Sequence, residues 1–195
     1  MILGADTDIA LSEPIALGER PLTDRQQSGL FSDMPGLWHL LHTKSRQEKA
    51  LAESLAAMAV PCFLPLLRVK RNYGGRKAVA DLPMFPGYVF LRGSLDQAYL
   101  ADRTKRVAQV IRVVDQTRIT WELRNIELAL LKEAFLDPFP RLVRGTRVEV
   151  KTGPFRGLQG VIEDRSKRDR LILQVDVLGK AASLEIDGAQ VEPLD

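Results

Sequence analysis

Hydrophobic and polar positions change their spacing along the chain, and each change predicts a different element. Residues 38–42 (WHLLH) are mostly apolar and compatible with a short strand. Apolar side chains then recur at the spacing of one helix face, at Leu51, Leu55 and Met58. Ser45 and Glu48 stand before this stripe at the spacing of a capping box, and Pro61 follows it. The pattern predicts a strand, then a helix that begins near Ser45 and stops before Pro61.

A proline and a glycine interrupt one of the most hydrophobic stretches, MFPGYVF at 84–90. Pro86 cannot donate a hydrogen bond to a sheet, and Gly87 removes a side chain where a close backbone approach is needed. We therefore predict a strand that opens at Pro86 and runs over 87–91, with aromatic residues at its entrance.

Four further segments complete the first two thirds of the chain. They are a strand at 62–69, a short helix at 95–106, a strand at 107–114 and a helix at 121–135 with Thr120 as its N-cap. Residues 68–77 carry five basic residues and no acidic one around Gly74-Gly75, which predicts the tip of a basic hairpin. Pro138 and Pro140 end the region.

From residue 141 onward the pattern changes to short alternating segments separated by glycines and polar turns. The predicted strands lie at 147–151, 160–163, 171–177, 183–186 and 190–192. Several short strands within about 50 residues predict a small β-barrel rather than helices. The expected organisation is a disordered leader at 1–35, a first domain at 36–137, a linker at 138–144 and a barrel domain at 145–195.

Composition places the protein among ordinary globular chains, with 45% hydrophobic and 27% charged residues in 195. No uninterrupted apolar run reaches the roughly 20 residues that a bilayer requires. The first residues carry early acids and no basic segment, unlike a signal peptide. We therefore expect a cytoplasmic protein that does not enter membranes. A single cysteine, Cys62, excludes an internal disulfide and a multi-cysteine metal site.

The net charge of +3 hides an uneven distribution of charge. Residues 1–35 contain six acidic and two basic residues, a net of −4, so the remaining 160 residues carry +7. A basic body suggests a polyanionic neighbour such as nucleic acid, although a solvated basic surface without a partner has the same composition.

Motifs of common enzyme classes are missing from the sequence. It contains no G-x-S-x-G, no P-loop and no H-E-x-x-H, and Gly74-Gly75 lacks the Lys-Ser/Thr that completes a phosphate loop. We therefore predict a binding protein rather than an enzyme, without a cofactor or a metal.

Two stretches, in this order, resemble the NusG-type transcription elongation factors. Trp38, HTKS at 42–45 and MFPGYVF at 84–90 are similar to the N-terminal domain of that family. GTRVEVKTGPFRGLQGV at 145–161 is similar to a KOW motif. The resemblance covers residues 37–193 and implies an α+β fold. A four-stranded antiparallel sheet flanked by helices would precede a small all-β KOW barrel.

The resemblance also implies partners for particular residues. In the family, aromatic residues of the F-P-G-Y strand line a depression that docks the clamp helices of the largest RNA polymerase subunit. The matching residues here are Trp38, Phe85, Pro86 and Tyr88. From the residues alone, these rings are equally compatible with a hydrophobic core.

The HTKS loop would face the second-largest polymerase subunit and the non-template DNA strand. Its residues are His42, Thr43, Lys44 and Ser45. Small donors and one cation at the start of a helix suit an anionic partner. The basic hairpin could contact upstream DNA phosphates through Arg68, Lys70, Arg71, Arg76 and Lys77. A solvated hairpin tip without a partner remains the alternative.

Two departures from the general family pattern point to a specialised paralogue of the RfaH type. The segment after the second helix reads VIRVV at 110–114 instead of the usual Gly-Phe-(Val/Ile)-Gly. The barrel loop reads Leu178-Gly179-Lys180 where general members have Phe-Gly, which puts termination factor Rho in doubt and leaves a small-subunit ribosomal protein open. The barrel residues expected to bind a partner are Phe155, Leu178 and Lys180.

The resulting hypothesis is a monomeric transcription elongation or antitermination factor that binds RNA polymerase and suppresses pausing or termination. The alternative is a ribosome-associated KOW protein that binds folded RNA through shape and phosphate contacts.

Overall fold

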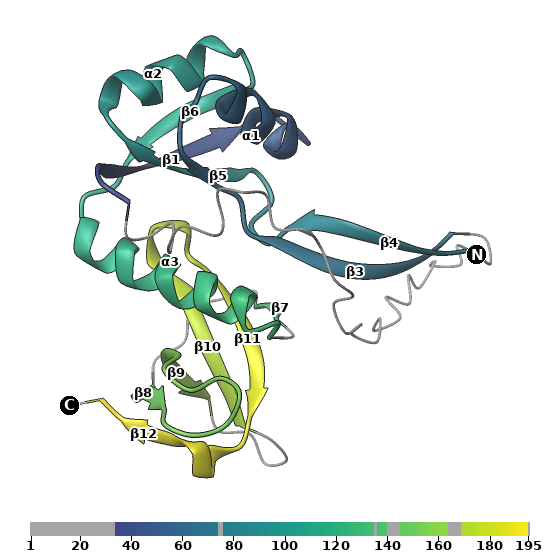
Figure 1. Ribbon diagram of the computed structural model, residues 1–195, viewed down its shortest axis with the longest axis vertical. Coiled ribbons are helices and arrows are strands. Elements are labelled where there is room, and N and C mark those ends of the chain that lie inside the picture. The colour runs from purple at the N-terminus through teal and green to yellow at the C-terminus, as the bar shows by residue number, and fades with distance from the viewer. Residues whose placement is uncertain (1–33, 74–75, 135, 140–144, 164–168, 195) are drawn as a thin grey trace, which may run out of the picture.

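The computed structural model describes residues 34–73, 76–134, 136–139, 145–163 and 169–194 (Figure 1). The leader expected at 1–35 therefore lies almost entirely outside the described residues. The first part of the fold is an antiparallel four-stranded sheet in the order β2-β5-β1-β6. Its strands are β1 (Leu37–Thr43), β2 (Cys62–Phe63), β5 (Tyr88–Gly93) and β6 (Val107–Arg112). The four-stranded antiparallel sheet implied by the family resemblance is confirmed.

Three helices flank this sheet, α1 (Glu48–Ala57), α2 (Leu95–Arg103) and α3 (Gln116–Leu131). Side chains of the central strands alternate between its two faces. Leu41 and Val89 pack with α1, whereas Leu40 and Phe90 belong to the cluster that contains α3. The sheet is therefore a layer with helices on both faces (Figure 1).

Two predicted helix starts were wrong, for identifiable reasons. Helix α1 begins at Glu48 with Gln47 as a cap that makes no side-chain bond, so Ser45 does not form a capping box. Arg46 has φ 59°, a left-handed conformation that interrupts the helix before Glu48. Helix α3 begins five residues before Trp121, because Asp115 accepts the Arg118 N–H and caps it instead of Thr120.

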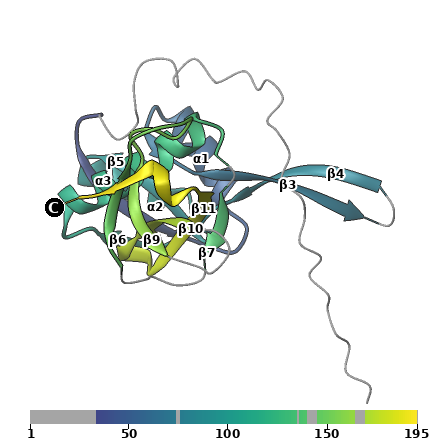
Figure 2. The same cartoon turned by 90° about the horizontal axis from the view of Figure 1, so that it is seen from below.

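Strands β3 (Leu66–Tyr73) and β4 (Arg76–Pro83) form a two-stranded hairpin that projects away from the sheet (Figures 1 and 2). Its register pairs Tyr73 with Arg76 across two intervening residues, Gly74 and Gly75. The predicted hairpin is confirmed, while its glycine tip lies outside the described residues. The strand after it begins at Tyr88, because Pro86 and Gly87 form the preceding turn.

The C-terminal part is a curled antiparallel sheet of six strands, in the order β12-β8-β9-β10-β11-β7. Its strands are β7 (Asp137–Phe139), β8 (Arg147–Val150), β9 (Gln159–Glu163), β10 (Asp169–Val175), β11 (Lys180–Ile186) and β12 (Val191–Pro193). All five strands predicted after residue 146 are present. The linker was expected to begin at residue 138, where the structure has strand β7 paired with β11. Strands β7 and β12 are the two edge strands of this sheet.

Helix α3 lies between the two sheets and joins them into one core (Figure 1). A single hydrophobic cluster contains Trp38 and Phe85 of the first part, Leu123 of α3, and Leu173 and Leu184 of the C-terminal sheet. No helix among the described residues is long and apolar enough to cross a membrane.

Candidate functional site

The Pro86-Gly87 turn is fixed against the start of α1 and the end of β1. Gly87 has φ +88°, a conformation that favours glycine. Its N–H donates to Glu48 Oε1 at 2.6 Å, and its carbonyl accepts the Thr43 N–H at 2.8 Å. These two bonds satisfy both backbone groups of Gly87. The positive φ explains why this apolar stretch contains a glycine. Glu48 therefore anchors the turn.

The predicted aromatic residues occupy two environments. Trp38 and Phe85 are each 1% exposed, and Phe85 meets Phe90 edge to face at 6.1 Å. Tyr88 is only partly buried, and the His42 ring stacks on it with centroids 5.1 Å apart. Tyr88 and His42 thus form the more accessible part of this surface, next to a buried aromatic core.

Trp38 is anchored to the first turns of α3. The Gln116 side chain accepts the Trp38 N–H at 2.7 Å and donates to the Trp38 carbonyl at 3.0 Å. The indole Nε1–H donates to Thr120 Oγ1 at 3.0 Å, and the Arg92 guanidinium lies 5.0 Å from the ring centroid. Thr120, expected as a helix cap, is therefore a partner of Trp38.

Of the residues expected to bind partners of the C-terminal domain, Lys180 instead contacts the first domain. Lys180 Nζ lies 4.9 Å from the Tyr88 ring centroid and 3.5 Å from the Pro86 carbonyl oxygen. Phe155 and Leu178 are partly buried against the cluster that contains Trp38 and Phe85. The structure thus places Lys180 of one predicted binding surface beside Tyr88 and Pro86 of the other.

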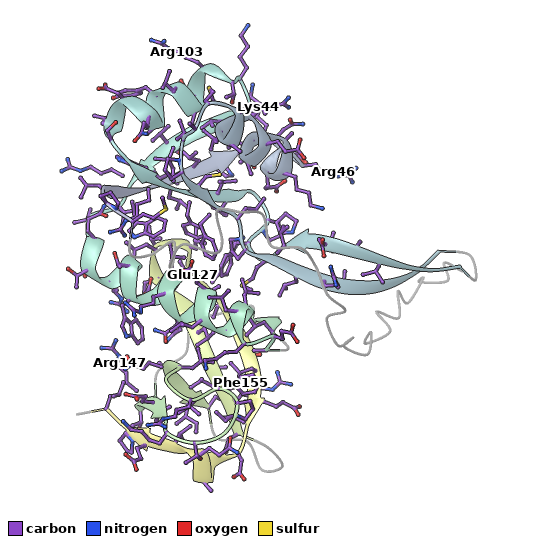
Figure 3. All side chains as sticks on the ribbon, in the orientation of Figure 1. Lys44, Arg46, Arg103, Glu127, Arg147 and Phe155 are labelled. Carbon is purple, nitrogen blue, oxygen red and sulfur yellow. The ribbon has the colours of Figure 1, made fainter. Side chains whose placement is uncertain are left out.

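A polar contact between α3 and the C-terminal sheet accompanies this arrangement. Trp121 Nε1–H donates to Gln159 Oε1 at 2.7 Å, and the Gln159 N–H donates to Asn125 Oδ1 at 2.7 Å. The Arg147 guanidinium lies over the Trp121 ring, 4.2 Å from its centroid. Figure 3 shows Arg147 at the side of the C-terminal sheet that faces α3. These polar residues gave no signal in the sequence because each alone looks like a surface residue.

Three charged residues meet at the same boundary. Arg118 donates from Nε to Glu122 Oε1 at 3.1 Å and pairs through Nη2 with the Asp176 carboxylate. Glu122 Oε2 accepts the Asp176 N–H at 3.2 Å. The Glu122 side chain is 2% exposed, and burial raises its pKa to about 7, with the neighbouring Asp176 charge adding to the rise.

A groove of about 490 Å³ runs along this boundary. Its lining includes Asp115, Arg118, Glu122, Arg147 and Asp176. The buried carboxyl group therefore lies at the wall of an opening between the two parts of the molecule.

The HTKS loop lies beside the turn between α2 and β6. The Lys44 N–H donates to the Arg106 carbonyl at 2.8 Å, and Arg106 Nη1 donates to Gln47 Oε1. Lys44, Ser45 and Arg46 are exposed, whereas Thr43 is 4% exposed and its Oγ1 has no hydrogen-bond partner among the described residues. Of the predicted loop residues, Lys44 and Ser45 are therefore the ones presented to solvent.

The HTKS loop and the turn between α2 and β6 together carry a group of basic residues that the sequence analysis did not predict as one surface. We define the basic rim as Lys44, Arg46, Lys49, Arg103, Lys105 and Arg106. Figure 3 shows Lys44, Arg46 and Arg103 at the α1 and α2 end of the molecule, remote from Arg147 and Phe155. Three bases within 103–106 were visible in the sequence, but only the fold brings them to the HTKS loop.

The hairpin bases are only partly described. Arg68 Nε lies 3.4 Å from Asp81 Oδ1, its partner across the strands. The side chains of Lys70, Arg71, Arg76 and Lys77 lie outside the described residues. Within the described ranges, no cluster of His, Cys, Asp and Glu side chains could hold a metal ion.

Comparison with known proteins identifies the first part of this fold. A family model described as transcription termination factor nusG matches residues 36–131. Over these residues the chain is similar to the NusG family. This matched region, called the NusG domain below, contains the Pro86-Gly87 turn, the HTKS loop and α3. The first stretch that carried the resemblance therefore lies within the match, and the KOW-like stretch at 145–161 lies outside it.

Named relatives extend the similarity to much of the chain. Transcription termination/antitermination protein NusG of Neisseria meningitidis is 26% identical over 156 residues, covering 76% of this chain and 88% of that protein. The Escherichia coli K12 protein of the same name is 26% identical over 137 residues, covering 67% and 76%. A solved structure described as "Domain interaction in Thermotoga maritima NusG" is 22% identical, covers 82% of this chain and 97% of that chain, and has a TM-score of 0.42.

Proposed function

We propose that the protein is a transcription elongation or antitermination factor that binds RNA polymerase through its NusG domain. The clamp helices of the largest subunit would dock at the exposed Pro86 and the partly buried Tyr88, over the rings of Trp38 and Phe85, which are each 1% exposed in the described arrangement. One observation carries this proposal. The Pro86-Gly87 turn, held by Glu48 and the Thr43 N–H, presents Tyr88 beside a buried aromatic core. Aromatic side chains in a groove are a favourable receptor for helices.

In this proposal, the described arrangement is a closed form that does not yet engage polymerase. Lys180 covers Tyr88 and contacts the Pro86 carbonyl, so a docking helix and Lys180 would compete for the same place. Polymerase binding would then require the C-terminal sheet to move away. The apparent affinity would equal the affinity of the open form multiplied by the fraction of molecules that are open.

The basic rim would contact the second-largest polymerase subunit and the phosphates of the non-template DNA strand. Its exposed cations lie on both sides of the Lys44–Arg106 backbone bond. Positive charge on a rigid backbone frame favours phosphate contacts without specifying sequence. The hairpin bases Arg68, Lys70, Arg71, Arg76 and Lys77 remain candidates for upstream DNA.

The C-terminal part would be a KOW barrel that recruits a second partner once released. We propose a small-subunit ribosomal protein as that partner, with Phe155, Leu178 and Lys180 in the contact, and a boundary near the 138–144 linker. The Leu178-Gly179 loop and the VIRVV segment favour a specialised RfaH-like paralogue over a general factor. Such a factor would work in the cytoplasm as a monomer.

Binding of the full chain to bacterial core RNA polymerase tests the proposal. Tyr88→Ala is the informative variant, because Phe85 is buried and its removal would also disturb the core. We expect Tyr88→Ala to weaken binding about tenfold, as for an aromatic hot spot. Tyr99→Ala is the matched control, since Tyr99 is 55% exposed on α2, outside the proposed surface.

Tyr88→Ala also removes a closing contact with Lys180, which by itself would favour binding. Lys180→Ala separates the two effects, because it removes the same closing contact and leaves the NusG domain intact. We expect Lys180→Ala to keep or increase polymerase affinity. Equal affinities for Lys180→Ala and for the double variant Tyr88→Ala/Lys180→Ala, in folded proteins, would refute the docking surface.

A further inference from the structure

Polymerase docking leaves one buried charged group without an assigned role. Glu122 lies on α3, at the boundary with the C-terminal sheet and away from the Pro86-Gly87 turn. Its carboxyl group accepts two hydrogen bonds, one from Arg118 on its own helix and one from the Asp176 N–H across the boundary. The Asp176 bond exists only while the two parts of the molecule are in contact.

The charges around Glu122 do not balance when every group is ionised. Arg118 lies between two carboxylates, those of Glu122 and Asp176. Asp115 at the start of α3 and Arg147 of β8 also line the adjoining groove. The three carboxylates, Asp115, Glu122 and Asp176, exceed the two guanidinium groups, those of Arg118 and Arg147, by one negative charge. A single proton would make the group neutral, which favours burial at an interface.

We propose that Arg118, Glu122 and Asp176 form a proton-operated latch, in which the Glu122 carboxyl takes up one proton from solvent when the two parts close. The groove beside Glu122 gives solvent a route to this carboxyl. As a regulatory device the latch rests on the proposed function, because closing covers the surface that would dock polymerase.

The direction of the effect follows from the pKa in the two forms. In the closed form the pKa of Glu122 is about 7, raised first by burial and then by Asp176, against an ordinary value of 4.5 for the exposed group. Proton uptake by Glu122 therefore stabilises the closed form. This stabilisation is complete below the ordinary pKa of 4.5 and is lost as pH rises through about 7. The equilibrium constant for closing should therefore increase about tenfold from pH 8 to pH 6.

Hydrogen exchange in the full chain, without polymerase, measures this constant. The Asp176 amide and the Trp121 indole N–H are both bonded across the boundary, to Glu122 and Gln159. After correction for intrinsic exchange chemistry, we expect protection of both groups to be about tenfold greater at pH 6 than at pH 8. The Lys44 amide, bonded to Arg106 within the NusG domain, should show no such change.

Glu122→Gln carries no titratable group and should abolish the pH dependence at both reporters. Glu53→Gln, a matched change at an exposed position of α1, should retain it. Asp176→Asn keeps the backbone N–H but removes the second carboxylate, so the transition should move to lower pH. His42 stacks on Tyr88, which Lys180 also contacts, so any effect of His42 on closing would persist in Glu122→Gln.

Unchanged protection between pH 8 and pH 6 in the wild type would overturn the latch, as would a tenfold change that persists in Glu122→Gln. Protection near unity at every pH would show that the parts do not stay closed, and would overturn it as well. None of these readouts uses polymerase, so loss of the latch and loss of polymerase binding are separate results.

Discussion

At the scale of single residues, Glu48 is the side chain on which the Pro86-Gly87 turn depends. It is 7% exposed, and its carboxylate accepts the Gly87 N–H at 2.6 Å. We expect Glu48→Ala to lower the free energy of unfolding by about 2 kcal/mol, because a buried N–H loses a charged acceptor. Urea unfolding of the full chain measures this loss. Glu53→Ala, exposed on the same helix, should stay within about 0.5 kcal/mol of the wild type. Equal effects of the two changes would contradict the anchoring role.

Residue-level signals predicted the turn but not what holds it. The Pro-Gly pair indicated a close backbone approach, but a Cβ at Gly87 would lie 3.7 Å from the His42 ring, an ordinary contact, and it is the φ of +88° that favours glycine. Glu48 was interpreted as part of a capping box with Ser45, since that spacing is the local signature. The left-handed backbone of Arg46 delays the helix and frees the Glu48 side chain to reach a residue 39 positions away. Local spacing cannot reveal a partner at that separation.

At the scale of elements, the apolar period located α1, α2, α3 and most strands, and the errors fell at element boundaries. The strand predicted at 62–69 is divided into β2 and β3. The first turn of α3 is Gln116-Thr117-Arg118-Ile119, where three polar residues hide the helical period. Asp115 was the available cap signal. The helix predicted at 95–106 ends earlier, because α2 stops at Arg103. Lys105, at φ 58°, belongs to the following turn, which contributes to the basic rim.

The basic rim predicts a salt-dependent affinity for single-stranded DNA. If Arg103 and Lys105 each contact one phosphate, the double change Arg103→Ala/Lys105→Ala should weaken binding and reduce the log–log salt slope by about 1.4. Titration of a fluorescent oligonucleotide at several salt concentrations gives both values. Arg156→Ala/Arg170→Ala removes the same charge from the C-terminal sheet and should leave the slope unchanged. A similar reduction in both double variants would indicate non-specific attraction rather than a contact at the rim.

At the scale of the whole molecule, the sequence predicted both parts of the fold but not their contact. Each part has its own apolar pattern, which is local information. Their boundary depends on Trp121 with Gln159, 38 positions apart, and on Pro86 with Lys180, 94 positions apart. These residues are polar or charged or lie in turns, so each is individually compatible with solvent. Only the assembled fold shows that Lys180 of one predicted binding surface contacts Tyr88 and Pro86 of the other.

Trp121 allows the closed form to be weakened in graded steps without changing the proposed polymerase surface. Trp121→Phe loses the hydrogen bond to Gln159 but keeps a ring beneath Arg147, a loss of about 1 kcal/mol in favour of opening. Trp121→Ala loses both contacts, about 2 kcal/mol or roughly 30-fold in the closing constant. Small-angle scattering should show the radius of gyration rising from wild type to Phe to Ala.

Polymerase affinity should rise in the same order, because a larger fraction of the chain is then free to dock. Lys132→Ala is a useful comparison, since Lys132 Nζ makes a single longer contact with the Pro154 carbonyl at 3.4 Å and its removal should open the molecule only slightly. If the radius of gyration increases through the series while polymerase affinity stays constant, the C-terminal sheet covers a surface that polymerase does not use. The closed arrangement would then regulate the C-terminal partner alone, because Lys180, one of the residues proposed to bind that partner, is engaged in the closing contact.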